Sequence, residues 1–141
     1  MNSDRTKIAL IQMRCGSEPE KNFAHAIEFI REAAKKGAQI VCLPELFRSQ
    51  YFCQTEDHKN FDLAEEVPGR STVALGKVAR ETGTVVIASL FERRSAGVYH
   101  NTAAIINTDG KLLGKYRKMH VPDDPLYHEK FYFNPRSPGV K

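Results

Sequence analysis

The sequence predicts an α/β layered fold in which helices pack on a mostly buried sheet. Apolar runs of strand length alternate with segments that repeat apolar residues at helical spacing. One of these strand-like runs, within residues 39–43, is continuously apolar after Gln39, which is typical of strands buried on both faces. An Asp-Gly turn between two later strand-like runs predicts a hairpin. The order β-α-β-α-β, followed by a hairpin and a long loop, favours this class.

The first strand, helix and strand follow one another without a long connection. Residues 7–13 form a short apolar run with β-branched content, which predicts a buried strand. Residues 20–36 predict a helix with one buried face, and Gly37 stands where a C-terminal cap belongs. Residues 39–43 predict a second buried strand, which ends at Pro44. The predicted buried face of the helix consists of Phe23, Ile27, Ile30 and Ala34.

The middle of the chain combines an aromatic loop with a second helix. Residues 48–67 predict an irregular loop, and Pro68-Gly69 predicts a turn. Residues 71–82 predict a helix with Ser71 or Thr72 near its N-cap, because a hydroxyl there can accept from a free backbone N–H.

Three more strands follow the second helix. Residues 84–91 predict the third strand, and residues 98–107 and 112–116 predict the two arms of the hairpin. The chain after Pro122 predicts irregular structure, and residues 134–139 predict a connection. A sheet with only two helices leaves one face poorly covered, so we expect more chain or a partner to cover it.

The composition is that of one globular domain in a reducing compartment. The 141 residues are 41% apolar and carry a net charge of +4. No nucleic-acid-binding motif accompanies the basic residues, so we expect no nucleic-acid partner. The three cysteines are odd in number and lack metal-ligand spacing, so we expect no disulfide framework and no metal. The sequence shows no secretory or membrane-spanning segment, and we expect a cytoplasmic protein without a membrane partner.

Two charged residues are candidates for catalysis. Glu45 follows a strand and a proline, at the end of the strand where ligands bind in α/β sheets. A partly desolvated carboxylate there can serve as a general acid or base, and the alternative is a surface salt bridge. Lys118 can stabilise a developing oxyanion, and the alternative is a solvated basic sheet edge.

Two further residues each allow more than one role. His120 can act as a base or a metal ligand, but no second ligand stands at suitable spacing, which favours a packed or hydrogen-bonded histidine. Glu129 has aromatic neighbours that can desolvate it, and the alternative is a surface ion pair with Lys130 or a nearby Lys or Arg. Phosphate-binding glycine motifs and the Gly-x-Ser-x-Gly motif are absent, so nucleotide binding and serine hydrolysis lack support.

Three stretches in this order resemble the nitrilase superfamily of carbon-nitrogen hydrolases. Residues 7–13 resemble its first strand, residues 43–47 its glutamate motif and residues 114–122 its lysine motif. Residues 47–54 and 122–135 resemble one branch, the N-carbamoylputrescine amidases of polyamine synthesis. The resemblance implies a four-layer α-β-β-α sandwich, of which residues 1–141 would be the N-terminal part. It also implies a homo-oligomer and no cofactor.

The resemblance also implies roles for individual residues. Glu45 would be the general base and acid, Lys118 would hold the tetrahedral oxyanion, and Glu129 would be a second, positioning carboxylate. The nucleophile of the family is a cysteine on a later strand. The cysteines of this chain, Cys15, Cys42 and Cys53, do not match that position. We therefore expect the nucleophile beyond this chain, and the chain alone to be inactive.

The expected reaction is hydrolysis of a non-peptide C–N bond, with N-carbamoylputrescine giving putrescine, CO2 and ammonia. Tyr51, His120 and Asp123 are predicted to contact this small-molecule substrate. Asp123 and Asp124 follow the lysine motif and suit a cationic amine, although a solvated acidic turn is the alternative. An amidase or ureido-acid hydrolase of the same fold would also fit these residues, as would a non-catalytic interaction module without the nucleophile.

Overall fold

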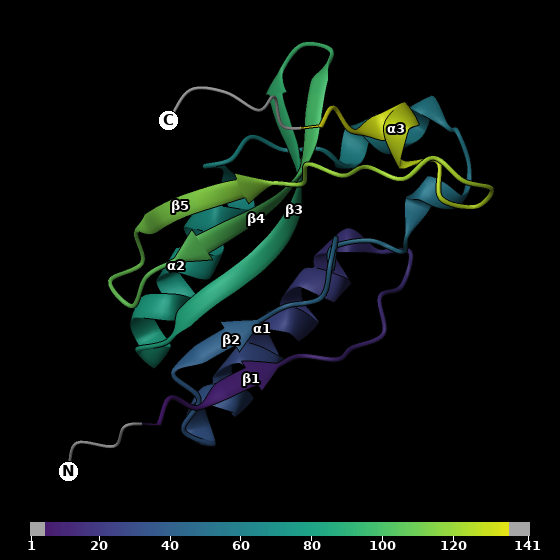
Figure 1. Ribbon diagram of the computed structural model, residues 1–141. Helices are drawn as coiled ribbons and strands as arrows, with labels where there is room; N and C mark the ends of the chain where they lie inside the picture. Colours follow the sequence, from purple (N-terminus) through teal and green to yellow (C-terminus); the bar gives the residue numbers. More distant parts are fainter. Residues whose placement is uncertain (1–4, 136–141) are drawn as a thin grey trace.

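The computed structural model describes residues 5–135 and shows one mixed sheet with helices on one of its faces (Figure 1). The sheet has five strands in the order β1-β2-β3-β4-β5. The first three strands are parallel, and the last three are antiparallel. The predicted α/β class is therefore confirmed. The strands are β1 Ile8–Leu10, β2 Ile40–Cys42, β3 Val85–Ser95, β4 Val98–Ile106 and β5 Leu112–Arg117.

Helices cover one face of the sheet and build the main core with it. Helices α1 and α2 lie side by side against this face (Figure 1). Burial of their apolar sides is the main source of stability, because each buried aliphatic side chain contributes about 1.5–3 kcal/mol. The helical segments are α1 Pro19–Lys35, η1 Phe52–Gln54, η2 His58–Leu63, α2 Arg70–Thr82 and α3 Glu129–Tyr132. The core includes Ala26, Ile30, Val41, Leu75, Ala79, Val86, Ala88, Ala104 and Ile106.

Helix α1 agrees with the predicted helix in extent but presents a slightly different face. Glu18 is its N-cap, and Gly37 follows its end with φ of 84°, a conformation that glycine adopts without strain. Ile30 is buried as predicted. Phe23 and Ile27 are only partly buried, since small Ala26 and Ala33 bring the helix close to the sheet.

Helix α2 begins one residue earlier than predicted. Gly69 is the N-cap, and Ser71 and Thr72 lie in the first turn, near the N-cap as predicted. The Thr72 hydroxyl accepts from the Gly69 N–H at 2.8 Å and donates to the Gly69 carbonyl at 2.9 Å. The hydroxyl is three residues inside the helix and still satisfies the first turn.

Strand β1 differs from the buried strand that was predicted for residues 7–13. It is confined to Ile8–Leu10 and lies at the edge of the sheet. Ile8 is 56% exposed and Leu10 is 79% exposed, so this is not a buried strand. Within this strand only Ala9 faces the helices, because side chains alternate along a strand and the face of the sheet that carries Ile8 and Leu10 is uncovered.

The uncovered face of the sheet is apolar over several strands. Its residues alternate with those of the core and are exposed or half-buried, as the predicted shortage of helices requires. That more of the chain or a partner covers this face stays a prediction. Residues 136–139 of the predicted connection lie outside the described residues. The apolar residues of this face include Ile8, Leu10, Ile40, Val85, Ile87 and Tyr116.

Two glycines let helix α2 and the β4–β5 turn meet. A Cβ added to Gly76 would lie 2.5 Å from the Gly110 carbonyl oxygen. Replacing a glycine inside a helix with alanine usually raises the free energy of unfolding by about 1 kcal/mol. Here we expect Gly76→Ala to lower the free energy of unfolding by about 1–3 kcal/mol, since backbone must move to relieve the overlap. Urea titration measures this, with Gly114→Ala as the control because its Cβ meets no atom within 4 Å. Unchanged or higher stability of Gly76→Ala would contradict the close contact.

The β5 strand contains one irregularity that sets its register. Ile105 pairs with Gly114, whereas the adjacent Ile106 pairs with Leu112. Leu113 is therefore an extra residue in the strand, a β-bulge.

Candidate functional site

The predicted catalytic residues gather at one edge of the sheet. Strands β2 and β5 both run parallel to β3, so their carboxyl ends meet at the same edge. Glu45 follows β2, and Lys118 directly follows β5. The segment that carries α3 passes over this edge (Figure 1). Ligand sites of α/β sheets form at such an edge.

Glu45, Lys118 and Glu129 form a connected group, here called the Glu-Lys-Glu cluster. The Lys118 ammonium donates to Glu45 Oε1 at 3.2 Å and to Glu129 at 2.8 Å (Oε2) and 3.1 Å (Oε1). Glu129 is 2% exposed, so its ion pair with Lys118 is buried and the alternative of a surface ion pair with Lys130 or a nearby Lys or Arg was wrong. The Glu45 side chain remains 54% exposed, which is more open than expected for a partly desolvated carboxylate.

The cluster holds Lys118 in its charged form. Burial lowers the pKa of Lys118, but its hydrogen bond to Glu129 and the charges of Glu45 and Glu129 outweigh burial, so the pKa is raised overall. The side chain is therefore an ammonium at neutral pH. A fixed cation beside a carboxylate can stabilise an oxyanion while the carboxylate moves protons.

Aromatic packing fixes Glu129. This residue begins α3, whose Tyr132 packs with Phe52 and Phe91 in a second apolar cluster. The predicted aromatic surroundings of Glu129 are thus present. The Tyr51 hydroxyl donates to Glu129 Oε1 at 2.9 Å. Burial and the hydrogen bond to Glu129 raise the pKa of Tyr51, so the phenol keeps its proton and holds the carboxylate in place.

Asn101 is a central residue of the site that the sequence did not reveal. Its side-chain amide donates to Glu45 Oε1 at 2.6 Å, and its backbone carbonyl accepts from the Lys118 backbone N–H at 2.9 Å. Ser89 Oγ donates to Asn101 Oδ1 at 3.1 Å, which fixes the amide orientation. Asn101 is buried within β4. A polar residue inside an apolar strand was the signal that could have indicated it.

Replacing Asn101 should reduce turnover more than stability. In the natural protein, we expect Asn101→Leu to lower the kcat of the hydrolysis that the sequence predicts about 10- to 100-fold, because Glu45 loses the donor that orients it. Ammonia release measures kcat, and thermal unfolding measures stability. Asn107→Leu, just after the end of β4, is the control. If kcat stays within a factor of about two, Asn101 does not position Glu45.

The predicted substrate contacts lie at different distances from the cluster. Tyr51 contacts Glu129 directly. Asp123 is exposed and lies 3.8 Å from the Lys130 ammonium, and His120 is exposed. Over residues 5–135, no hydrogen bond or ion pair joins His120 or Asp123 to the cluster. His120 is thus not packed in the interior, and a hydrogen bond of its ring stays a prediction. A surface hollow lies near the lysine motif, and His120 and Lys130 are among the residues that line it.

The cysteines of the chain are free and poorly suited to nucleophilic attack. Cys53 lies in η1 and is fully buried. Burial first, and then the charge of Glu129, raise its pKa to about 12, so the thiolate is scarce at neutral pH. Cys15 Sγ donates to the Phe47 carbonyl at 3.2 Å, and burial raises its pKa as well. Cys42 is half-buried in β2.

The described part of the chain contains neither a metal-ligand group nor a transmembrane helix. Among residues 5–135, no three or more His, Cys, Asp or Glu side chains are grouped to hold a metal ion. No helix within the same residues is both long and apolar enough to cross a membrane.

Comparison with known proteins identifies the family. The sequence pattern of the carbon-nitrogen hydrolases matches residues 7–140. The chain belongs to the carbon-nitrogen hydrolase family. The superfamily that the motifs indicated is therefore confirmed. An N-carbamoylputrescine amidase from Solanum lycopersicum is 41% identical over 135 residues, covering 95% of this chain and 45% of the relative. A citrullinase from Francisella tularensis is 37% identical over 135 residues, covering 96% of this chain and 47% of the relative.

A solved member of the family has the same fold over this chain. A carbon-nitrogen hydrolase from Helicobacter pylori G27 is 39% identical with a TM-score of 0.89, covering 95% of this chain and 46% of that chain. The chain thus spans about half the length of the relatives it matches.

Proposed function

We propose that residues 1–141 are the N-terminal part of one carbon-nitrogen hydrolase domain that hydrolyses N-carbamoylputrescine. The observation that carries this proposal is the Glu-Lys-Glu cluster: a half-exposed carboxylate, a charged lysine and a buried carboxylate within hydrogen-bonding distance. Cleaving a ureido C–N bond is difficult because the carbon is a poor electrophile. It calls for a nucleophile, a proton carrier and a cation at the carbonyl oxygen.

The first half of the reaction forms a covalent intermediate. A cysteine thiolate from outside this chain attacks the ureido carbon, and the C–O double bond becomes an oxyanion held by the Lys118 ammonium. Glu45 delivers a proton to the nitrogen of the departing –NH2 group as the C–N bond breaks. The products of this half are ammonia and an S-carbamoyl enzyme that still carries the amine. The hydrogen bond of the Lys118 ammonium to Glu129 at 2.8 Å supports this role, because it holds the cation in one position.

The second half releases the amine. Glu45, now ionised, takes a proton from water, and the hydroxide adds to the carbonyl of the S-carbamoyl enzyme. The thiolate leaves, and the resulting carbamic acid decomposes to putrescine and CO2. Because the Glu45 side chain is partly exposed, water can reach the same carboxylate that protonated the leaving nitrogen.

The substrate assignment rests on relatives and on charge. The relative from Solanum lycopersicum is named N-carbamoylputrescine amidase. We assign the ammonium of the substrate to Asp123, whose exposed carboxylate lies on the segment that leads to α3. Tyr51 and His120 remain proposed substrate contacts. His120 lies on the same segment as Asp123, and Tyr51 lies on the loop that contacts Glu129. Assembly as a homo-oligomer is a further part of this proposal.

Ammonia release by the full natural protein tests the proposal. N-carbamoylputrescine should be cleaved with a higher kcat/KM than citrulline or a simple aliphatic amide. In that protein, Asp123→Lys should lower kcat/KM for the amine more than for a neutral amide. Turnover of all three compounds at background rate would contradict hydrolase activity and favour a non-catalytic interaction module.

An amidase or ureido-acid hydrolase is the second candidate. The observation that favours it is the 37% identity to a protein named citrullinase. A preference for citrulline in the same assay would replace the carbamoyl-amine assignment and retain the Glu-Lys-Glu chemistry.

A further inference from the structure

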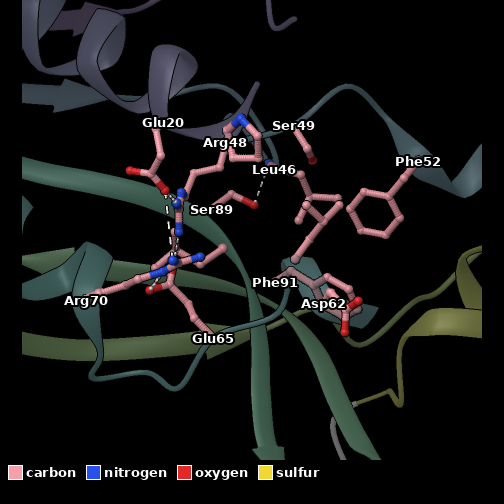
Figure 2. Close-up of a pocket in the computed structure, with 13 residues that line it drawn as sticks. Glu20, Leu46, Arg48, Ser49, Phe52, Asp62, Glu65, Arg70, Ser89 and Phe91 are labelled. Atoms are coloured by element: carbon pink, nitrogen blue, oxygen red, sulfur yellow. Dashed lines mark hydrogen bonds and ion pairs between the residues drawn. The ribbon is translucent and has the colours of Figure 1, made fainter. Parts of the chain in front are cut away.

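The hydroxyl of Ser89 lies between the residue that follows Glu45 and the residue that holds the Glu45 carboxylate. The Leu46 N–H donates to Ser89 Oγ at 3.1 Å, and Ser89 Oγ donates to Asn101 Oδ1 at 3.1 Å. Figure 2 shows the bond from Leu46, at the wall of a cavity of about 250 Å³ that Leu46 and Ser89 both line. The Asn101 amide in turn donates to Glu45 Oε1 at 2.6 Å. One hydroxyl is therefore linked to Glu45 through its chain neighbour and through its hydrogen-bond donor.

Leu46 fixes the direction in which this hydroxyl donates. A backbone N–H can only donate, so Ser89 Oγ accepts from Leu46, and the one hydrogen of the hydroxyl is left for Asn101. Leu46 is itself held firmly, because its side chain is 4% exposed and packs with Phe52 and Phe91 in the second apolar cluster. Its φ of 49° is uncommon for leucine, which shows how closely the packing constrains this residue.

The Ser89 hydroxyl determines which end of the Asn101 amide faces Glu45. An asparagine amide has an oxygen that accepts and an NH2 group that donates. With Ser89 donating to the oxygen, the NH2 group faces the carboxylate. The reversed amide would place its oxygen against the Glu45 carboxylate and leave the Ser89 hydrogen without this acceptor, and both changes are unfavourable. The hydrogen bonds are thus mutually consistent in one orientation of the amide.

We propose that Ser89 is a positioning residue for the hydrolysis, because it keeps the Asn101 amide in the orientation that holds Glu45. Within residues 5–135, no hydrogen bond joins Ser89 to the Glu-Lys-Glu cluster itself, so Ser89 acts through Asn101. Without the hydroxyl the amide turns more freely, and Glu45 loses its donor for part of the time. The effect on turnover rests on the proposed function, whereas the orientation of the amide does not.

Turnover of the natural protein tests this role through the loss and the retention of the hydroxyl. We expect Ser89→Ala to lower kcat for ammonia release about tenfold and to leave KM within a factor of about two, because Glu45 moves protons during the chemical step. Ser89→Thr keeps the hydroxyl and should retain kcat within a factor of about three. Ser89→Val has nearly the shape of threonine without the hydroxyl and should behave as Ser89→Ala does.

The threonine and valine variants form a matched pair that remains informative if Ser89→Ala does not fold. Ser89 lines the cavity of Figure 2, so there is open space beside it for the added methyl group. The control is Ser71→Ala, which removes a buried hydroxyl that accepts from Arg48 and has no link to the cluster in the described part of the chain. Its kcat should be unchanged. Equal kcat values for folded Ser89→Thr and Ser89→Val would overturn the proposal.

A double substitution shows whether Ser89 acts through Asn101. In the Asn101→Leu background, Ser89→Ala should change kcat by less than a factor of about two, because the amide that Ser89 orients is already gone. A further tenfold loss in this background would mean that Ser89 supports the fold or reaches Glu45 by another route, and it would overturn the proposal.

Hydrogen exchange of the Asn101 side-chain amide tests the same orientation without turnover. The protein is labelled with 15N-asparagine, and the signal that disappears in Asn101→Leu is assigned to this amide. We expect exchange to be about tenfold faster in Ser89→Ala and Ser89→Val and unchanged in Ser89→Thr and Ser71→Ala. Equal exchange rates in all variants would overturn the role of Ser89 in orienting the amide. A lack of ammonia release by the unmodified protein would contradict the proposed function alone, since the exchange rates do not depend on it.

Discussion

Replacing Lys118 with methionine should lower kcat of the full natural protein about 100- to 1000-fold. Methionine has a similar length but no charge, so the oxyanion loses the cation that Glu45 and Glu129 hold in place. Removing one oxyanion donor has effects of this size in other hydrolases. Ammonia release under saturating substrate measures kcat.

The matched control for Lys118→Met is Lys111→Met. Lys111 is exposed in the β4–β5 turn, at the opposite end of β5 from Lys118, and its loss should leave kcat unchanged. Circular dichroism shows whether both variants keep their fold. A Lys118→Met protein that is folded and retains kcat within a factor of about three would remove Lys118 from the reaction.

Replacing Glu92 with glutamine should lower the free energy of unfolding by about 3–5 kcal/mol. Glu92 is 1% exposed and accepts from Lys115 Nζ at 2.7 Å, from Arg117 Nε and Nη2 at 2.7 Å each, and from Thr102 Oγ1 at 2.6 Å. The neutral side chain leaves two cations without their counter-charge. Guanidinium chloride unfolding measures the loss.

The same carboxylate predicts a specific sensitivity to acid. Burial raises the pKa of Glu92, but hydrogen bonds from Arg117, Lys115 and Thr102 outweigh burial and hold the pKa at about 2. In the unfolded chain a glutamate titrates near about 4.3. Because the folded pKa is the lower one, the stabilisation is complete above about pH 4.5 and is lost as the pH falls toward about 2.

Acid titrations of two variants separate this effect from general acid unfolding. Glu92→Gln should flatten the loss of stability between about pH 4.5 and about pH 2, because its amide does not titrate there. Glu81→Gln removes an exposed partner of Arg31 and should leave the profile close to that of the unmodified protein. If Glu92→Gln unfolds at the same denaturant concentration as the unmodified protein, the buried carboxylate does not contribute as described.

The order of elements could be read from the sequence because periodicity reports burial along one element at a time. Helices α1 and α2 and the β4–β5 hairpin were predicted within a few residues. The exposure of β1 could not be read, since an apolar strand looks the same whether or not another layer covers it. This difference depends on contacts that lie outside the strand itself.

Glu45 was predictable because it follows a buried strand. Lys118 and Glu129 were predictable because the sequence around them resembles the motifs of a known family. Asn101 and Glu92 were missed, since each acts through partners that pairing of β3, β4 and β5 brings together. The burial of Cys53 on the predicted aromatic loop could not be read from that loop alone, because the side chains of α3, 75 or more residues later, close over it.

The bulge at Leu113 has a consequence for how the chain tolerates insertions and deletions. Arg117 and Lys118 are neighbours, yet one holds Glu92 on the helical side of the sheet and the other holds Glu45 and Glu129 on the opposite side. Because Leu113 is an extra residue, loss of one residue from this part of β5 can remove the bulge and leave Arg117 and Lys118 in place. A one-residue insertion between Gly114 and Arg117 would instead shift the pairing by one position and turn each cation to the wrong side, whereas length changes in the Ser95–Val98 turn would affect neither.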